Sequence, residues 1–261
     1  MFREKMGNEY LVVQDGTSEG TQIKYRKGEY WYKKDRRGRE GLAEYLVSGL
    51  LAYSDLKEDE YAVYESGYIN DSPGCRSKNF LKDGEELVTF YRLYYNEFGK
   101  DLSKILAVME RMEERIEFVV QFIWQMCGLD VTDYLKKIFT LDMITLNEDR
   151  HLNNLAVLFS GNKASPAPIF DNGISLLTAN QSVNWYFPIE ENVKRVVARP
   201  FSGSHEKMFQ YFGTGFHLDM DSARKWLEKE EISKEREVLL FQLERYPFLD
   251  LKETSNLRSS R

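Results

Sequence analysis

The stretch LDMITLNEDRHLNNLAVLF, Leu141–Phe159, joins an apolar helical pattern to an apolar strand pattern through a dense run of polar side chains. The polar run occupies residues 147–154 and includes Asn147, Asp149, Arg150, His151, Asn153 and Asn154. A loop between two core elements needs few such groups for packing alone. Functional side chains, by contrast, concentrate on loops that a rigid scaffold positions. The stretch therefore indicates a functional loop held between a helix and a strand.

The elements around this loop predict which oxygen atoms meet. The preceding residues 133–146 have apolar side chains at helical spacing, so we expect a helix there. LAVLF leaves the loop as a buried strand, and PIF (168–170) returns and ends at Asp171. If the two strands form an antiparallel hairpin, Asn154 and Asp171 lie at the same end, facing Asp149. These are hard oxygen ligands suited to Mg²⁺, with a further carboxylate beside them, as phosphoryl transfer requires.

The first third of the chain is expected to be rich in strands and to hold the phosphates of a nucleotide. Strands on both sides of DGTSEG (15–20) predict a loop of small residues whose backbone N–H groups allow close approach of phosphate. In EYWYKKD, Lys33 and Lys34 point to opposite faces of a strand, so one of them faces the cleft. GREGLAEYLVSGLLA (38–52) reads as an amphipathic helix, on which Glu40 and Glu44 share a face. We favour Glu44 as the partner of the cleft lysine, with Glu40 as the alternative.

The next segment is predicted to contact the adenine. YAVYES (61–66) reads as a strand that offers the backbone groups of Val63 to Glu65 to the base. GYINDSPGCRSKN (67–79) reads as a loop, and the chain beyond residue 80 reads as mainly helical. Helices are expected over 87–95, 102–128 (with a break), 133–146, 222–230 and 235–245.

NEDRHLNN (147–154) followed by PIFDNG (168–173) resembles the catalytic and metal-binding motifs of HipA-like kinases. These are bacterial serine/threonine kinases with a protein-kinase-like fold, related in architecture to phosphatidylinositol 3/4-kinases. The resemblance implies Asp149 as the catalytic carboxylate, with His151 supporting the loop geometry. It implies Asn154 and Asp171 as Mg²⁺ ligands.

The resemblance extends to the nucleotide-binding residues. DGTSEGTQIKY is similar to the phosphate loop of the family, which brings Ser18 and Gly20 to ATP and makes Ser18 a candidate autophosphorylation acceptor. The family pattern around WYK favours Lys33 over Lys34. Full-length HipA toxins carry an extra N-terminal subdomain, and the residues before this phosphate loop are too few to form one. An antitoxin-like regulator is the partner that the resemblance suggests.

Together these patterns predict an α+β, two-lobed protein-kinase-like fold. We expect a β-rich lobe over residues 1–66, a mainly helical lobe over 67–250 and a polar tail over 251–261. ATP and Mg²⁺ are the expected cofactors, and a protein Ser or Thr hydroxyl is the expected acceptor. Two alternatives stay open. One is a small-molecule or lipid kinase with the same machinery, and the other is a nucleotide-binding pseudokinase that acts as a regulatory module.

Composition excludes several other classes. The net charge of the 261 residues is −6, which disfavours a broad nucleic-acid surface. No segment is apolar and long enough for a signal peptide or a membrane span. Cys75 lies in a polar stretch and Cys127 in an apolar helix, so we expect no disulfide and a cytoplasmic location. The three histidines are far apart in sequence, without a CxxC or HExxH motif, which makes a structural zinc site improbable.

Overall fold

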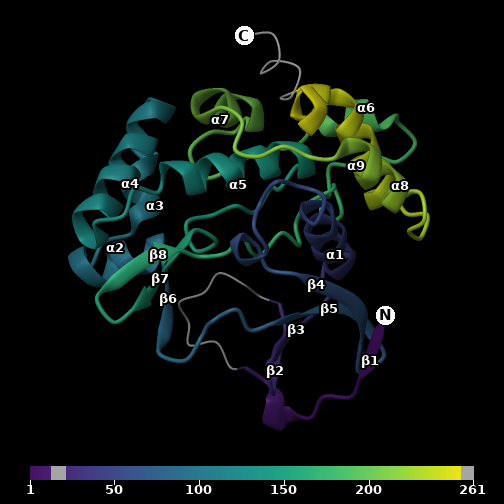
Figure 1. Ribbon diagram of the computed structural model, residues 1–261, viewed down its shortest axis with the longest axis horizontal. Coiled ribbons are helices and arrows are strands. Elements are labelled where there is room, and N and C mark those ends of the chain that lie inside the picture. The colour runs from purple at the N-terminus through teal and green to yellow at the C-terminus, as the bar shows by residue number, and fades with distance from the viewer. Residues whose placement is uncertain (13–21, 254–261) are drawn as a thin grey trace.

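The computed structural model describes residues 1–12 and 22–253, which form an α+β fold with a smaller, sheet-based lobe and a larger, mainly helical lobe (Figure 1). The two-lobed α+β architecture expected from the sequence is confirmed. The predicted phosphate loop, with Ser18 and Gly20, lies outside the described residues. So does most of the expected polar tail, from residue 254 onward.

The smaller lobe is built on a five-stranded sheet with the order β1-β4-β5-β3-β2. β1 runs parallel to β4, and the other neighbouring strands are antiparallel. The helix α1 (Glu40–Leu51) packs against β4 and β5. The strands are β1 (Phe2–Glu4), β2 (Lys24–Lys27), β3 (Tyr30–Lys34), β4 (Tyr64–Ile69) and β5 (Ser72–Lys78).

The prediction of a loop over residues 67–79 is wrong, because this segment forms most of the hairpin of β4 and β5. Asn70 and Asp71 both have positive φ, 49° and 61°, as the tight turn of a two-residue hairpin requires. The strands beside this turn contain glycine, proline and serine, a composition typical of loops, and this led to the wrong prediction. The lobe boundary expected after residue 66 therefore falls inside β4, and the first sheet continues to Lys78. Cys75 is not in a polar loop but buried in β5.

The larger lobe begins with a second sheet of three antiparallel strands, in the order β6-β7-β8. Its strands are β6 (Glu85–Thr89), β7 (Ala156–Ser160) and β8 (Lys163–Pro166). The helix expected from Leu87 starts later, at Phe90, because Thr89 caps it by accepting the N–H of Arg92 at 3.1 Å. The returning strand of the hairpin ends at Pro166 rather than in PIF, and Ile169 instead bridges to Tyr61.

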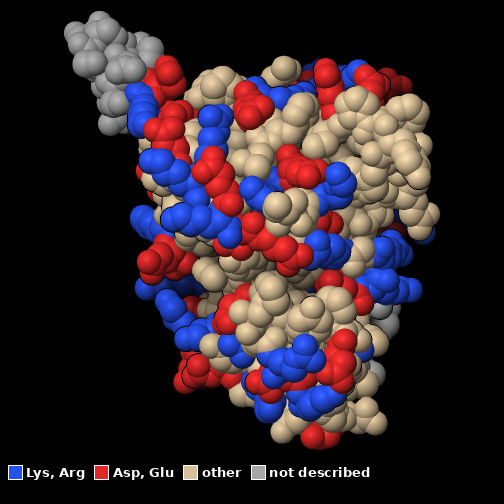
Figure 2. Space-filling view, turned by 90° about the vertical axis from the view of Figure 1, so that its right-hand side faces the viewer, with Lys and Arg blue, Asp and Glu red and all other residues tan. Residues whose placement is uncertain are grey.

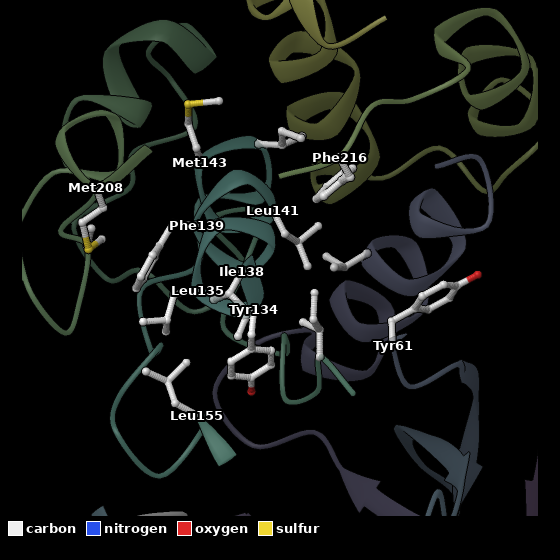
Figure 3. Packing of buried hydrophobic residues seen from close by; sticks show 14 of the residues in the cluster. Tyr61, Tyr134, Leu135, Ile138, Phe139, Leu141, Met143, Leu155, Met208 and Phe216 are labelled. Carbon is white, nitrogen blue, oxygen red and sulfur yellow. The ribbon is translucent and has the colours of Figure 1, made fainter. Parts of the chain in front are cut away.

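The helices of this lobe surround α5, as Figures 1 and 3 show. The expected break over residues 102–128 separates α3 from α4. The helices are α2 (Phe90–Phe98), α3 (Leu102–Ala107), α4 (Met112–Cys127), α5 (Thr132–Thr145), α6 (Ile189–Val193), α7 (His205–Phe212), α8 (Met220–Leu227) and α9 (Lys234–Arg245).

The helix α5 is the centre of the main hydrophobic core. Ten of its fourteen residues are buried, and Leu135, Ile138, Phe139 and Leu141 belong to the core cluster shown in Figure 3. The helix ends at Leu146, which adopts a left-handed conformation with φ of 58°. A buried helix that ends at a fixed turn gives the following loop a rigid starting point.

The sequence predicts neither a disulfide nor a membrane-spanning helix. Cys75 and Cys127 are both free, as predicted. Among the described residues, no helix combines the length and the apolar character needed to cross a lipid bilayer.

Candidate active site

Lys33 lies at the contact between the two lobes and joins two carboxylates. Its Nζ atom is 2.7 Å from Oε1 of Glu44 on α1 and 2.7 Å from Oδ1 of Asp171. The hydroxyl of Tyr64 lies 3.5 Å away. Lys33 is buried, whereas Lys34 on the opposite face is partly exposed. The structure thus selects Lys33 and Glu44 from the pairs that the sequence left open.

Glu40 is occupied elsewhere. Its carboxylate accepts the backbone N–H groups of Arg36, Arg37 and Gly38 at 3.1, 2.7 and 3.1 Å, and so it holds the turn that leads into α1. Glu44 has a second contact of another kind, because its Oε2 accepts the N–H of Asn172 at 2.8 Å. Glu44 therefore connects the lysine strand to the segment that follows Asp171.

Burial and charge oppose each other in this cluster. Burial disfavours the Lys33 ammonium, but the carboxylates of Asp171 and Glu44 outweigh it and raise the pKa of Lys33 well above its ordinary value. Burial raises the pKa of Glu44, and the charge of Lys33 only partly offsets this. For Asp171, Lys33 outweighs burial, so that the pKa of this carboxyl is lowered. Lys33 is thus charged at neutral pH, and Asp171 is an anion.

The loop after α5 is fixed by its own side chains. Asn147 accepts the N–H of Asp149 at 2.9 Å, and the Asn147 carbonyl lies 2.8 Å from Nε2 of His205 at the start of α7. The Nδ2 group of Asn154 donates to the carbonyl of Asp149 at 2.9 Å. These bonds fix the distance between Asp149 and Asn154 along the loop, as the spacing of the motif predicted.

Arg150 is the site residue that sequence reasoning missed. Its guanidinium is fully buried and contacts the equally buried Asp142 of α5 through two nitrogen–oxygen pairs, at 3.0 and 2.9 Å. It also donates to Oδ1 of Asn172 at 2.6 Å and to the carbonyl of Phe170 at 2.8 Å. Arg150 thereby joins α5, the loop and both neighbours of Asp171. The signal was present in the sequence, because Asp142 stands seven residues after Leu135 on the buried helix face and needs a cation there.

Asp149 and His151 border the same open space. The side chain of Asp149 is 44% exposed, and its Oδ2 lies 3.9 Å from Nε2 of His151. The Nδ1 atom of His151 is buried and has no hydrogen-bond partner among the described residues. Asp171 adopts a left-handed backbone with φ of 60°, an uncommon conformation for a residue other than glycine. The chain therefore holds Asp171 in a strained position next to Lys33.

A cavity of about 550 Å³ brings most of these groups together. Four of the predicted site residues line it, namely Asp149, His151, Asn154 and Asp171. Val63 and Glu65 are not among the lining residues of this cavity, and their contact with the base stays a prediction. Val63 is 60% exposed, and Glu65 forms an ion pair with Arg76 at 2.8 Å. The strand that carries them was predicted too early in the chain.

The oxygen atoms fit a magnesium ion that is shared with phosphate. Within the described part of the chain, no group of three or more His, Cys, Asp or Glu side chains could enclose a metal by itself. Asn154 and Asp171 both line the cavity, and Oδ1 of Asn154 accepts no hydrogen bond from a described residue. Mg²⁺ is commonly held by one or two protein oxygens together with phosphate and water. Asn154 and Asp171 meet that requirement.

The fold and this site define a class: a two-lobed α+β protein with the architecture of protein kinases. Over 92% of the chain and 95% of its counterpart, the structure is similar to the Helicobacter pylori proinflammatory kinase CtkA, with a TM-score of 0.56 and 15% sequence identity. The kinase-like fold that the sequence implied is thereby confirmed, and at this identity the likeness concerns the fold alone.

A second solved structure is similar at a lower level. It is HipA of the Shewanella oneidensis MR-1 toxin–antitoxin system, in a complex with HipB and operator DNA, with a TM-score of 0.49 and 11% identity. The match covers 92% of this chain and 63% of HipA, so the chain spans less than two thirds of that protein. No protein-family model and no curated protein sequence matches the chain.

Proposed function

We propose that this chain is an ATP- and Mg²⁺-dependent phosphotransferase of the HipA-like type, with a protein Ser or Thr hydroxyl as its acceptor. One observation carries the proposal. Lys33 of β3, Glu44 of α1 and the distant Asp171 form a single ion cluster next to the cavity that Asp149 and Asn154 line. Phosphoryl transfer in kinases uses a lysine–glutamate pair, two metal ligands and a carboxylate in this arrangement.

Each residue has a defined role under this proposal. Lys33 binds the α- and β-phosphates of ATP, and Glu44 holds its ammonium in place. Asn154 and Asp171 hold Mg²⁺, which when bound neutralises charge on the phosphates. Asp149 orients the acceptor hydroxyl and accepts its proton, and its exposed carboxylate can reach a substrate in the cavity. His151 supports the position of Asp149.

The rate gain would come from positioning and from charge rather than from covalent chemistry. The ion pair between Arg150 and Asp142 connects the loop rigidly to α5. It would hold the carboxylate of Asp149 in position before the substrate binds. An antitoxin-like regulator belongs to the same proposal and rests on the sequence resemblance alone, whereas a cytoplasmic location rests on the two free cysteines.

Transfer of labelled γ-phosphate in the presence of Mg²⁺ tests the proposal. Wild type should label a mixed protein substrate, and Asp149→Asn should reduce the rate by about 100-fold or more, as expected for loss of a general base. Asp83→Asn, an exposed aspartate outside the cavity, is the matched control and should keep the full rate. Equal labelling by wild type and Asp149→Asn would refute the assignment of the site.

The same assay separates the alternatives. If label enters only small hydroxyl compounds or lipids, the chain is a kinase with another acceptor. If ATP binds but neither wild type nor Asp149→Asn transfers label, the chain is a pseudokinase and the proposal is wrong.

A further inference from the structure

The cavity is rich in cations that form no ion pair with a carboxylate of the described residues. Its lining includes five basic side chains from four segments: Lys24, Arg36, Arg37, Arg92 and Arg199. Within residues 1–12 and 22–253, none of the five has a carboxylate oxygen within 4.0 Å. This is unusual for a chain with a net charge of −6.

Most carboxylates of the cavity are engaged elsewhere. Glu40 accepts three backbone N–H groups, Glu148 accepts the side-chain amide of Asn180 at 2.8 and 2.9 Å, and Asp171 contacts Lys33. On the face of the molecule in Figure 2, by contrast, Lys and Arg are intermixed with Asp and Glu. Arg199 opposes the rise in the pKa of Glu148 that burial causes, but neither Arg199 nor Arg92 forms an ion pair with a carboxylate of the described residues. Both guanidinium groups can therefore bind an anionic ligand.

Two of the five cations belong to segments that are bonded to the loop of Asp149. Arg92 lies in the first turn of α2, whose capping residue Thr89 donates a hydrogen bond to Asn153 at 3.1 Å. On the other side, the segment of Arg199 is attached to the loop through Val197, whose N–H donates to Glu148 at 3.4 Å. Both arginines thus belong to segments that are bonded to the catalytic loop, one before and one after Asp149.

The other cations belong to the smaller lobe. Lys24 lies on β2 and favours the anionic form of Asp171 electrostatically, which places it on the phosphate side of the cavity. Arg36 and Arg37 precede α1, next to Glu40. These three cations share the smaller lobe with Lys33, the proposed phosphate contact, whereas Arg92 and Arg199 belong to the larger lobe with Asp149, the residue proposed to orient the acceptor.

We propose that Arg92 and Arg199 bind acidic side chains of the acceptor, so that the preferred substrate is a Ser or Thr in a peptide with carboxylates on both sides of the hydroxyl. This inference rests on the proposed function. Guanidinium groups bind carboxylates through paired N–H donors, which gives direction as well as charge attraction. The chemistry is the same transfer: the acceptor oxygen forms a bond to the γ-phosphorus, the bond to ADP breaks, and Asp149 takes the hydroxyl proton.

Steady-state kinetics with three synthetic peptides tests the inference. Each peptide carries one central Ser, flanked on both sides by Glu, by Ala or by Lys. Wild type should have the lowest KM for the Glu peptide and the highest for the Lys peptide. Arg92→Gln and Arg199→Gln should each raise the KM for the Glu peptide by roughly threefold to fivefold, as expected for one partly exposed ion pair. The KM for ATP should change less than twofold.

Two further variants exclude a merely structural effect. Arg26→Gln, an exposed arginine of β2 outside the cavity, is the matched control and should keep the peptide preference. The double variant Arg92→Glu/Arg199→Glu should reverse the order and prefer the Lys peptide. Misfolding would lower activity towards all three peptides and cannot reverse the order of preference.

The possible failures differ from one another. If wild type labels all three peptides with equal KM, or if the reversed variant keeps the Glu preference, this inference is overturned and the proposed kinase stands. If label enters only small compounds, the acceptor is not a peptide and the inference falls with that part of the function. If no acceptor is labelled at all, the kinase proposal itself has failed.

Discussion

Lys33 and Arg150 both form buried ion pairs, but the two pairs differ in what surrounds them. Arg150 and Asp142 are completely enclosed, and the guanidinium has further hydrogen bonds to Asn172 and Phe170. Lys33 contacts two carboxylates, one of which, Asp171, is 29% exposed and lines the cavity. One pair is closed and saturated, whereas the other opens onto solvent.

The difference separates a structural ion pair from the cluster that we propose takes part in phosphoryl transfer. A fully bonded, enclosed pair can hold its neighbours in place but has no donor or acceptor left for a ligand. Lys33 contacts two carboxylates, so a phosphate can replace one of them while the other still balances the charge of the lysine. The two clusters meet at residues 170–172, where the scaffold pair fixes the backbone on both sides of Asp171.

Removing the scaffold cation should have the largest effect on stability. Arg150→Met keeps an unbranched apolar stem but removes the guanidinium and leaves Asp142 buried without a cation, and we expect a loss of about 3–5 kcal/mol in the free energy of unfolding. Urea unfolding followed by circular dichroism measures it. A loss below about 1 kcal/mol would mean that the pair is not enclosed as described.

Removing the lysine of the open cluster should instead affect transfer. Lys33→Met should lower the rate of γ-phosphate transfer by roughly 100-fold, equivalent to about 2.7 kcal/mol. The Lys33→Met variant should lose less stability than Arg150→Met, because Glu44 has a raised pKa and can become neutral by taking up a proton. Parallel rate and urea measurements check both parts, with Lys34→Met as the matched control. A stability loss equal to that of Arg150→Met would remove the distinction between the clusters.

Replacing both partners of the closed pair should restore most of the stability. Asp142→Leu/Arg150→Met contains no uncompensated charge, and we expect it to recover at least half of the loss of Arg150→Met, to within about 2 kcal/mol of wild type. Asn172 and Phe170 still lose a donor, so full recovery is not expected. A double variant as unstable as the single one would show that shape rather than charge sets the cost.

The smallest effect concerns Asp35, a partly buried carboxylate that precedes α1. Burial raises the pKa of Asp35 from 3.8 to about 6. Because the folded protein holds this proton more tightly than the unfolded chain, stability falls as the pH rises from about 4 to about 6. Asp35→Asn keeps the acceptor for the N–H of Gly41 and removes the charge.

Asp35→Asn should therefore be more stable than wild type by about 1 kcal/mol at pH 7.5, after allowance for partial exposure, and the difference should vanish near pH 4. Melting temperatures across this pH range measure it. The exposed Asp83→Asn serves as a control with no such trend, and a pH-independent difference for Asp35→Asn would contradict the account.

Side chains with a chemical task were easier to predict than the backbone around them. Asp149, Asn154 and Asp171 could be placed because their spacing fits a loop and a strand hairpin, and Lys33 because a strand exposes only one of two adjacent lysines to the cleft. The choice between Glu40 and Glu44 depended on where backbone N–H groups lie, and that requires the fold.

The errors have a common physical origin. The hairpin between β4 and β5 was missed because Asn70 and Asp71 form its turn while glycine and proline weaken the strand pattern beside them. Arg150 does lie in the loop, but its partner Asp142, a helix residue eight positions earlier, was not predicted because the pairing depends on how the loop packs on α5.

The rate of Mg²⁺-dependent transfer of labelled γ-phosphate by Asp171→Asn, compared with wild type, tests the central claim most directly. Asparagine keeps the size of the side chain but removes the charge that pairs with Lys33 and would hold the metal. We expect measurable transfer by wild type and a rate lower by at least about 100-fold in the variant, which should still unfold in one cooperative transition. Equal rates for the two proteins would contradict the assignment of this cavity as a phosphotransfer site.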